Sequence, residues 1–268
     1  MSNYVLECEN LGIVFGGLAA VDQFNIQVSG KEVAGLIGPN GAGKTTVFNL
    51  LTKVYEPTSG TIKLNGRDTA GETTVSLSKA GIARTFQNIR LFNNLTVADN
   101  VIAAMNQSMT YSLFESTFRL PRFWKEERAA RERALELLSI FDMQDLADVQ
   151  SSSLPYGAQR RLEITRALAT NPSLLLLDEP AAGMNPAETA ELMENIGRIR
   201  DTFGIAILLI EHDMSLVMGV CDQITVLNFG QVIAHGTPAE IQSNPVVIEA
   251  YLGKKKEAGE MHTVREFC

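Results

Sequence analysis

A chain of 268 residues can form one large domain or two small ones, and 45% hydrophobic with 20% charged residues is the composition of a globular protein with a substantial core. The formal net charge of −8 argues against a nucleic-acid partner, because an acidic surface repels a phosphate backbone. The longest apolar runs, such as 205–210, are far shorter than the roughly 20 residues that span a membrane, and residues 1–10 lack the apolar core of a signal peptide. Three widely separated cysteines without metal-ligand spacing predict reduced thiols in a cytosolic protein: Cys8, Cys221 and Cys268.

The first third of the chain has the pattern of antiparallel strands joined by turns. Strand-like stretches occur at 4–6, 24–28 and 61–64. The last of them runs into Asn65-Gly66, a pair that is typical of a tight hairpin turn. We therefore expect an antiparallel β subdomain at the N-terminus.

Four apolar runs bounded by turn residues predict buried strands at 33–37, 174–177, 206–210 and 224–227. Helical patterns follow several of them, at 43–52, 186–202 and 214–220. Repeated strand-then-helix order is typical of an α/β fold, and we expect the first three of these strands to lie in a mostly parallel sheet.

Residues 88–159 have a different character, because they lack strand-like runs. Apolar residues recur there at helical spacing, as Ala130, Ala134, Leu137, Leu138 and Phe141. The charged residues between them fit a solvated helix face. We therefore expect a helical subdomain of about 88–159, inserted into the α/β core.

A P-loop pattern, G-x-x-x-x-G-K-[ST], stands between a predicted strand and a predicted helix, as Gly38-Pro39-Asn40-Gly41-Ala42-Gly43-Lys44-Thr45. Glycines let such a loop turn its backbone N–H groups toward phosphate oxygens, and the helix N-terminus adds partial positive charge. Lys44 is expected to reach the β- and γ-phosphates of a bound nucleotide, and the Thr45 hydroxyl to bind Mg²⁺.

Two acids follow the apolar run at 174–177. We expect Asp178 to hold Mg²⁺ through water, and Glu179 to polarise the attacking water or accept its proton, a role worth roughly 10²–10⁴ in rate. Alone, such a pair also fits a solvated turn. Beside a P-loop, we interpret it as part of a hydrolytic centre.

With their neighbours, these motifs resemble the ATP-binding cassette (ABC) ATPases over residues 4–253. The resemblance implies one domain over 1–253, a P-loop NTPase core with an inserted helical signature subdomain. In this family Gln87 matches the Q-loop glutamine, which reaches Mg²⁺ and the attacking water, and His212 matches the switch histidine, which hydrogen-bonds the γ-phosphate. An aromatic ring stacks on adenine at the position of Phe15, for which a core phenylalanine is the alternative. The implied ATP-binding residues are Phe15, Gly38, Pro39, Asn40, Gly41, Ala42, Gly43, Lys44, Thr45 and Thr46.

The signature loop of the family, usually Leu-Ser-Gly-Gly-Gln before a basic helix, corresponds here to Leu154 followed by Pro155, Tyr156, Gly157, Ala158 and Gln159. Pro155 removes the usual serine hydroxyl and one N–H, which leaves the N–H groups of Gly157 and Ala158 as an anion site at a helix N-terminus. Two ATPases of this family enclose two ATP molecules, so the loop is expected to act on the partner's ATP. Asn185 of the D-loop (182–186) stands where aspartate is usual, so its contact with the partner is expected to be neutral.

Finer features resemble the ATPases of branched-chain amino acid uptake systems, in the segments 81–87, 156–164, 178–186, 211–214 and 244–253. This branch implies integral membrane permease subunits, a second ABC ATPase subunit, and indirectly an extracytoplasmic solute-binding protein. A sister ATPase chain is favoured over a homodimer. The expected location is the cytoplasmic face of the inner membrane.

Alternatives remain open at this point. The solute is also compatible with urea, amides or other amino acids, and a soluble ABC ATPase, a P-loop kinase or a non-hydrolysing subunit is a weaker candidate. The segment 105–124, rich in Phe and Met and ending at the only tryptophan, either docks a cytoplasmic loop of the membrane subunit or packs within the helical subdomain. The polar tail 254–268 is expected to be disordered.

Overall fold

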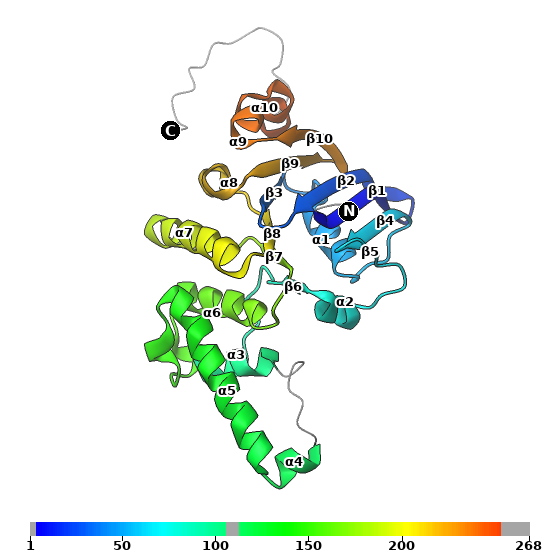
Figure 1. Cartoon of the computed structure of the whole chain (residues 1–268). Coiled ribbons are helices and arrows are strands. Elements are labelled where there is room, and N and C mark those ends of the chain that lie inside the picture. The colour runs from blue at the N-terminus through cyan, green and yellow to red at the C-terminus, as the bar shows by residue number, and fades with distance from the viewer. Residues whose placement is uncertain (1–3, 106–112, 253–268) are drawn as a thin grey trace.

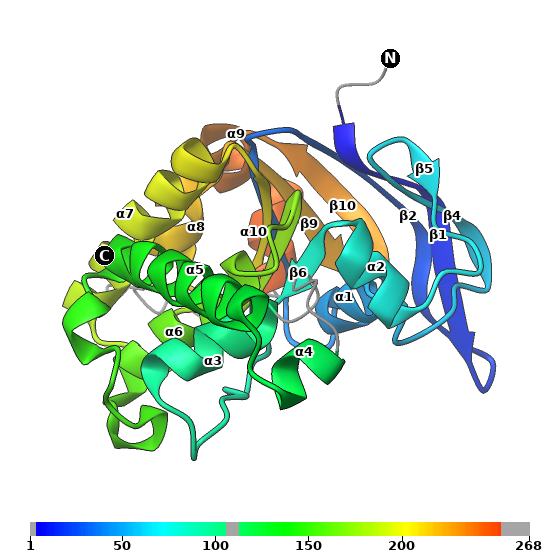
Figure 2. The same cartoon turned by 60° about the horizontal axis from the view of Figure 1, so that its bottom comes forward.

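The structure, a computed structural model, describes residues 4–105 and 113–252 (Figures 1 and 2). The predicted tail and residues 106–112 of the segment 105–124 lie outside the described residues. No helix in the described ranges is both long and apolar enough to cross a membrane.

The larger of two sheets has six strands in the order β10-β9-β3-β8-β7-β6. Its members are β3 (Val33–Ile37), β6 (Ile82–Arg84), β7 (Leu174–Asp178), β8 (Ala206–Ile210), β9 (Gln223–Asn228) and β10 (Gln231–Gly236). Neighbours are parallel except β10, which is antiparallel to β9. Every residue of β3, β7 and β8 is buried, because both faces of the sheet are covered. The predicted mostly parallel sheet is confirmed.

Two edge strands of this sheet were absent from the prediction. β6 has only three residues, too few for a periodic signal. β10 is a half-exposed strand on the far edge, so its sequence lacks a continuous apolar run.

The smaller, antiparallel sheet has the order β2-β1-β4-β5. Its strands are β1 (Tyr4–Phe15), β2 (Leu18–Ser29), β4 (Ser59–Leu64) and β5 (Arg67–Asp68). Both Asn65 and Gly66 have positive φ, 50° and 74°, as the predicted hairpin turn requires. The first two strands are much longer than expected, because irregular register shifts interrupt the alternation that the sequence pattern relies on.

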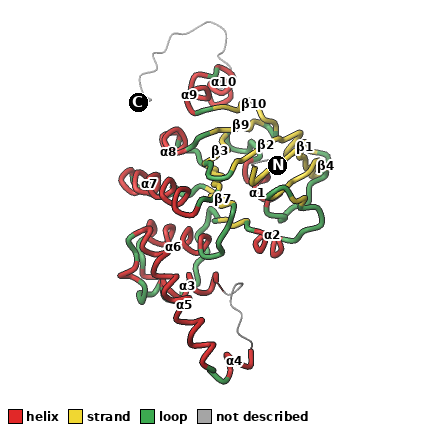
Figure 3. Tube along the Cα trace, in the orientation of Figure 1, coloured by secondary structure: helices red, strands yellow, loops and turns green. Residues whose placement is uncertain are grey.

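Ten α-helices lie in the described ranges: α1 (Lys44–Leu51), α2 (Thr74–Ala80), α3 (Val97–Met105), α4 (Leu113–Thr117), α5 (Pro121–Leu138), α6 (Tyr156–Leu168), α7 (Pro186–Phe203), α8 (Met214–Val220), α9 (Pro238–Ser243) and α10 (Pro245–Leu252). In Figure 3 the helices α3 to α6 gather at one end of the molecule, beyond β6, and α5 projects outward with α4 at its tip. The described part of 88–159 consists of α-helices, 3-10 turns and connecting loops, with one isolated bridge between Thr96 and Gln150. The expected helical subdomain is therefore present.

Side chains on the two faces of the parallel sheet enter two different apolar clusters. Leu174 and Leu176 of β7 pack with the antiparallel sheet and α1. Their neighbours Leu175 and Leu177 pack with the helices on the opposite face. Since successive side chains of a strand point to opposite faces, one apolar run stabilises both layers at once. The loops that follow β3, β7 and β8 are therefore anchored to strands that are fixed on both faces.

Candidate functional site

The predicted P-loop connects β3 to α1. Gly38 and Gly43 both have positive φ, 152° and 106°. A Cβ at Gly38 would lie 2.0 Å from the carbonyl oxygen of Leu227, and one at Gly43 would lie 2.8 Å from that of Ala20. The close approach of neighbouring backbone therefore requires glycine at both positions.

Lys44, the first residue of α1, is buried within this loop. Its Nζ donates hydrogen bonds to the carbonyl oxygens of Gly38 (2.7 Å) and Pro39 (3.0 Å). Burial lowers the pKa of Lys44, and the nearby carboxylates of Glu179 and Asp178 partly oppose that shift. The loop cation and the two predicted acids are thus close enough to interact electrostatically.

Asp178 ends β7 and forms a buried ion pair that no sequence motif indicated. The Arg84 guanidinium, at the end of β6, lies 2.8 Å from Asp178 Oδ2, and both side chains are less than a tenth exposed. Arg84 also donates hydrogen bonds to Asn49 Oδ1 (2.8 Å) and Thr52 Oγ1 (3.3 Å). Asn49 lies near the C-terminal end of α1, and Thr52 is the C-cap of that helix. Arg84 therefore ties the predicted metal-binding acid to the helix that starts at the P-loop.

Gln87 and Glu179, which are 92 residues apart in the chain, are in direct contact. Gln87 Nε2 donates a hydrogen bond of 2.8 Å to Glu179 Oε2. Glu179 has a φ of 47°, uncommon for a residue with a side chain, and its N–H is fixed on the carbonyl oxygen of Ile210 (2.9 Å). The structure therefore joins two of the predicted catalytic residues.

His212 and its buried neighbour Glu211 follow β8. The His212 side chain is 65% exposed, so its ring is available to a ligand. Glu211 is buried and accepts hydrogen bonds from the N–H groups of Ala181 (2.8 Å) and His212 (3.1 Å). Burial raises the pKa of Glu211, and these N–H groups oppose the shift. Glu211 links the loops after β7 and β8, a role that the sequence pattern around it does not reveal.

The interpretation of Phe15 as a core residue is wrong. Its ring is 44% exposed and belongs to neither apolar cluster. It lies edge-on to Tyr55, with ring centroids 5.2 Å apart. An exposed ring of this kind offers a surface for stacking.

The predicted signature loop forms the start of α6. Pro155 is the N-cap, and Tyr156, Gly157 and Ala158 form the first turn, where backbone N–H groups lack intrahelical partners. Asn185 has a local role in addition to its predicted place in the D-loop. Its side chain caps α7 by accepting from the N–H groups of Ala187 (2.9 Å) and Glu188 (3.0 Å).

A magnesium ion is compatible with the oxygen donors that follow β3 and end β7. Thr45 is exposed at the start of α1, and Arg84 engages only Oδ2 of Asp178 within the described ranges. Residues 4–105 and 113–252 hold no cluster of three or more His, Cys, Asp or Glu side chains fit for a metal. Mg²⁺ fits such a set, because it commonly binds one or two protein oxygens together with substrate phosphates.

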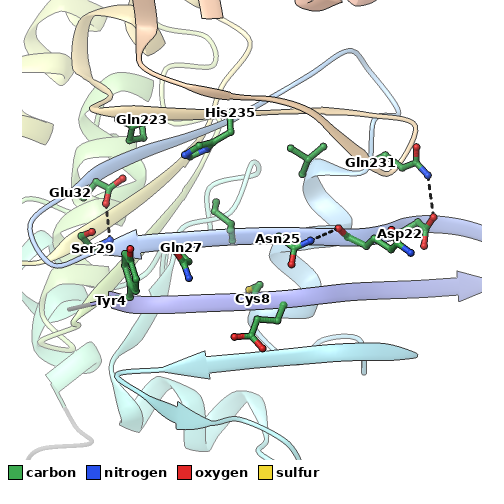
Figure 4. Close-up of a pocket in the computed structure, with 14 residues that line it drawn as sticks. Tyr4, Cys8, Asp22, Asn25, Gln27, Ser29, Glu32, Gln223, Gln231 and His235 are labelled. Atoms are coloured by element: carbon green, nitrogen blue, oxygen red, sulfur yellow. Dashed lines mark hydrogen bonds between the residues drawn. The ribbon is translucent and has the colours of Figure 1, made fainter. Parts of the chain in front are cut away.

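A groove of about 440 Å³ lies next to Gln87, between the parallel sheet and the helical end of the molecule. Its lining is largely apolar and includes Leu77, Ile82, Phe86, Ala104 and Ala167. A separate hollow of about 760 Å³, drawn in Figure 4, is lined by polar residues of β1, β2 and β10 such as Tyr4, Gln27 and His235. None of the predicted site residues lines that hollow.

The described part of the segment 105–124 exposes three aromatic side chains. Phe114, Phe118 and Trp124 are 64%, 61% and 53% exposed, at the tip formed by α4 and the start of α5. The interpretation that the segment packs inside the helical subdomain is therefore wrong for these three side chains, whereas Met105 is buried in the apolar cluster of that subdomain.

Comparison with known proteins gives consistent matches. A family model described as "ABC transporter" matches residues 21–182, and one described as "Branched-chain amino acid ATP-binding cassette transporter" matches residues 231–257. The chain is 47% identical to the high-affinity branched-chain amino acid transport ATP-binding protein LivG of Escherichia coli, and 45% identical to BraF of Pseudomonas aeruginosa. Each alignment covers 95% of this chain and 100% of the relative.

Solved structures agree with the fold. The ADP conformation of MJ1267, an ATP-binding cassette of an ABC transporter, superposes with a TM-score of 0.81 at 31% sequence identity. A nucleotide-free ATP-binding cassette from an ABC transporter gives 0.80, also at 31% identity. Both comparisons cover 94% of this chain and 100% of the other.

Proposed function

The chain belongs to the ABC transporter family, in the branch of branched-chain amino acid transport ATP-binding proteins, and on that basis we propose how its residues bind and hydrolyse ATP. It is the ATP-binding subunit of a branched-chain amino acid importer and couples ATP hydrolysis to transport.

The P-loop N–H groups and Lys44 bind the phosphates of ATP, Phe15 stacks on adenine, and Thr46 adds a contact at the start of α1. Glu179 accepts a proton from the attacking water, which Gln87 helps to position. His212 donates to the γ-phosphate. The observation that carries the proposal is the 2.8 Å contact between Gln87 and Glu179, beside a P-loop lysine that interacts with both Glu179 and Asp178.

Thr45, Asp178 and Gln87 are the residues that would hold Mg²⁺. When bound with ATP, the ion neutralises developing negative charge on the phosphate oxygens. The chain's own part is to place the oxygen donors, which Arg84 does for Asp178 by fixing its carboxylate on α1.

As an ABC transporter subunit, the chain works with permease subunits and a second ATPase subunit. We assign the latter to a sister chain, with a homodimer as the other possibility. The loop 155–159 and Asn185 act on the partner's ATP. The apolar groove beside Gln87 receives a cytoplasmic helix of a permease, because a ligand there would contact Phe86 and the residues next to it. The complex stands at the cytoplasmic face of the inner membrane and is supplied by an extracytoplasmic solute-binding protein.

Two variants test the assignment of the site. Lys44→Ala is expected to abolish ATP binding, because the phosphates lose their cation. Glu179→Gln is expected to bind ATP as the wild type does but to lose roughly 10²-fold or more in hydrolysis, and to accumulate as an ATP-bound dimer. Nucleotide affinity, phosphate release and light scattering measure these effects. A fully active Glu179→Gln protein would show that another group accepts the proton.

A further inference from the structure

Three charged residues on one face of α6 contact the segment 86–92, which contains Gln87. They are Arg160, Glu163 and Arg166, spaced three residues apart and therefore aligned along the helix. Arg160 is completely buried and Glu163 is 5% exposed. Arg166 donates to the carbonyl oxygen of Arg90 and lies 4.8 Å from the centroid of the Phe92 ring.

Arg160 holds this segment by its main chain. One guanidinium nitrogen donates to the carbonyl oxygen of Phe86 (2.5 Å), and the other donates to that of Gln87 (2.7 Å). A planar guanidinium can span two adjacent carbonyl groups, which a lysine ammonium cannot do with the same geometry.

Glu163 completes the contact from the same helix face. Its Oε2 lies 2.8 Å from Arg160, and its Oε1 accepts from the N–H groups of Phe86 (3.4 Å) and Arg90 (3.3 Å). One buried ion pair therefore binds both N–H groups and carbonyl oxygens of the backbone at 86–90. The side chain of Gln87 is left to contact Glu179.

The same arginine directly follows the signature loop in the chain. Arg160 also donates to the Tyr156 hydroxyl (3.4 Å), in the first turn of α6. A continuous series of hydrogen bonds thus runs from Glu179 through Gln87 and Arg160 to Tyr156. Its two ends belong to different ATP sites, since 155–159 acts on the ATP of the partner in the proposed function.

We propose that Arg160 and Glu163 are positioning residues that couple the Gln87–Glu179 contact in one ATP site to the signature loop that serves the other. The pair makes the Q-loop backbone (86–90) and the N-terminal turn of α6 move as one unit when ATP binds. This inference rests on the proposed roles of Gln87 and of the signature loop.

The test removes both charges together, in the double variant Arg160→Met/Glu163→Gln. Removing Arg160 alone would leave Glu163 buried and unpaired, whereas replacing a whole buried ion pair is often neutral for stability. The matched control is Arg161→Met, since Arg161 is the next residue on α6 but pairs with Glu191 of α7. Hydrogen–deuterium exchange is followed at 86–90 and at 155–160 with and without ATP and Mg²⁺, at a protein concentration where light scattering shows a monomer.

In the wild type and in Arg161→Met, ATP is expected to change exchange in both segments. In the double variant, ATP should bind with an affinity within about twofold of the wild type, but the ATP-induced change at 155–160 should fall by about fivefold or more. Retention of that change in the double variant would overturn the inference, as would its absence in a wild-type protein that binds ATP. Failure of the wild type to bind ATP would overturn the proposed function itself.

Discussion

The most constrained residues of the site are charged side chains that the fold has buried. Arg84 is the clearest case, because its guanidinium connects Asp178 to Asn49 and Thr52. A buried carboxylate without its partner carries a large desolvation cost. The ion pair therefore ties the position of Asp178, the proposed metal-binding acid, to the stability of this edge of the sheet.

Replacing Arg84 by methionine is expected to destabilise the protein by about 3 kcal/mol, because Asp178 would remain buried and unpaired. The same change at Arg131, whose ion pair with Asp148 is largely exposed, should cost at most about 1 kcal/mol. Urea unfolding of the two variants measures the difference. Equal losses would show that Arg84 contributes no more than a surface charge.

Glu211 gives a pH-dependent prediction. Its raised pKa means that the folded state holds the proton more tightly than the unfolded state, so its contribution to stability is fully present at low pH and is lost as pH rises through the folded pKa. Glu211→Gln removes this titration. The unfolding free energy of the variant minus that of the wild type should therefore increase as pH rises through the folded pKa of Glu211, as measured by urea unfolding. A difference that falls with pH would mean that the N–H groups around Glu211 outweigh its burial.

Among the helices and strands, the candidate site lies on the loops that follow the parallel strands. The N-caps of the next helices hold these loops in place. Asn185 illustrates this, because it begins α7 with Pro186 and Glu188 in a complete capping box. In the proposed function Asn185 belongs to the D-loop, and as an N-cap it cannot move without weakening its own helix.

Asn185→Ala should lower the unfolding free energy of the isolated chain by about 1 kcal/mol, since two N–H groups of α7 lose their acceptor. Asn185→Asp keeps the acceptor and should stay within about 0.5 kcal/mol of the wild type. Chemical denaturation of the monomer measures both. If Asn185→Ala impairs dimerisation while leaving monomer stability unchanged, the cap is dispensable and the residue acts only across the interface.

For the molecule as a whole, the proposed function makes activity depend on how the helical end closes on a second subunit. Pro155 begins α6 without a side-chain hydrogen bond, whereas a serine there could accept from the first turn or meet a phosphate. Because Pro155 departs from the family pattern in this way, we predict that the protein hydrolyses ATP but that its ATP-bound dimer closes less tightly.

Pro155→Ser is expected to strengthen ATP-driven dimerisation, by about 1 kcal/mol for one added hydrogen bond. Analytical ultracentrifugation of the Glu179→Gln background, with and without Pro155→Ser, measures the dimer under conditions where ATP persists. Unchanged dimerisation and an unchanged ATPase rate would rule out the proline as the cause of weak closure.

Features that depend on local order could be predicted from the amino-acid sequence alone. The strand-loop-helix pattern located the loop between β3 and α1, the apolar runs located the central strands, and the motifs indicated the ABC family. These signals are strong because an apolar run of strand length is followed directly by a short sequence motif. The roles of Asp178 and Glu179 stay predictions. The edge strands β6 and β10 were not predicted, because β6 has only three residues and β10 is half-exposed without a continuous apolar run.

Which distant residues meet became known only from the folded chain. Arg84 and Asp178 are 94 residues apart, Arg160 and Phe86 are 74 apart, and Glu211 and Ala181 are 30 apart. Each contact buries a charge, and a buried charge is stable only where the packed fold supplies its partner. That partner is set by sheet order and helix packing, which act across the chain and leave no local mark in the sequence.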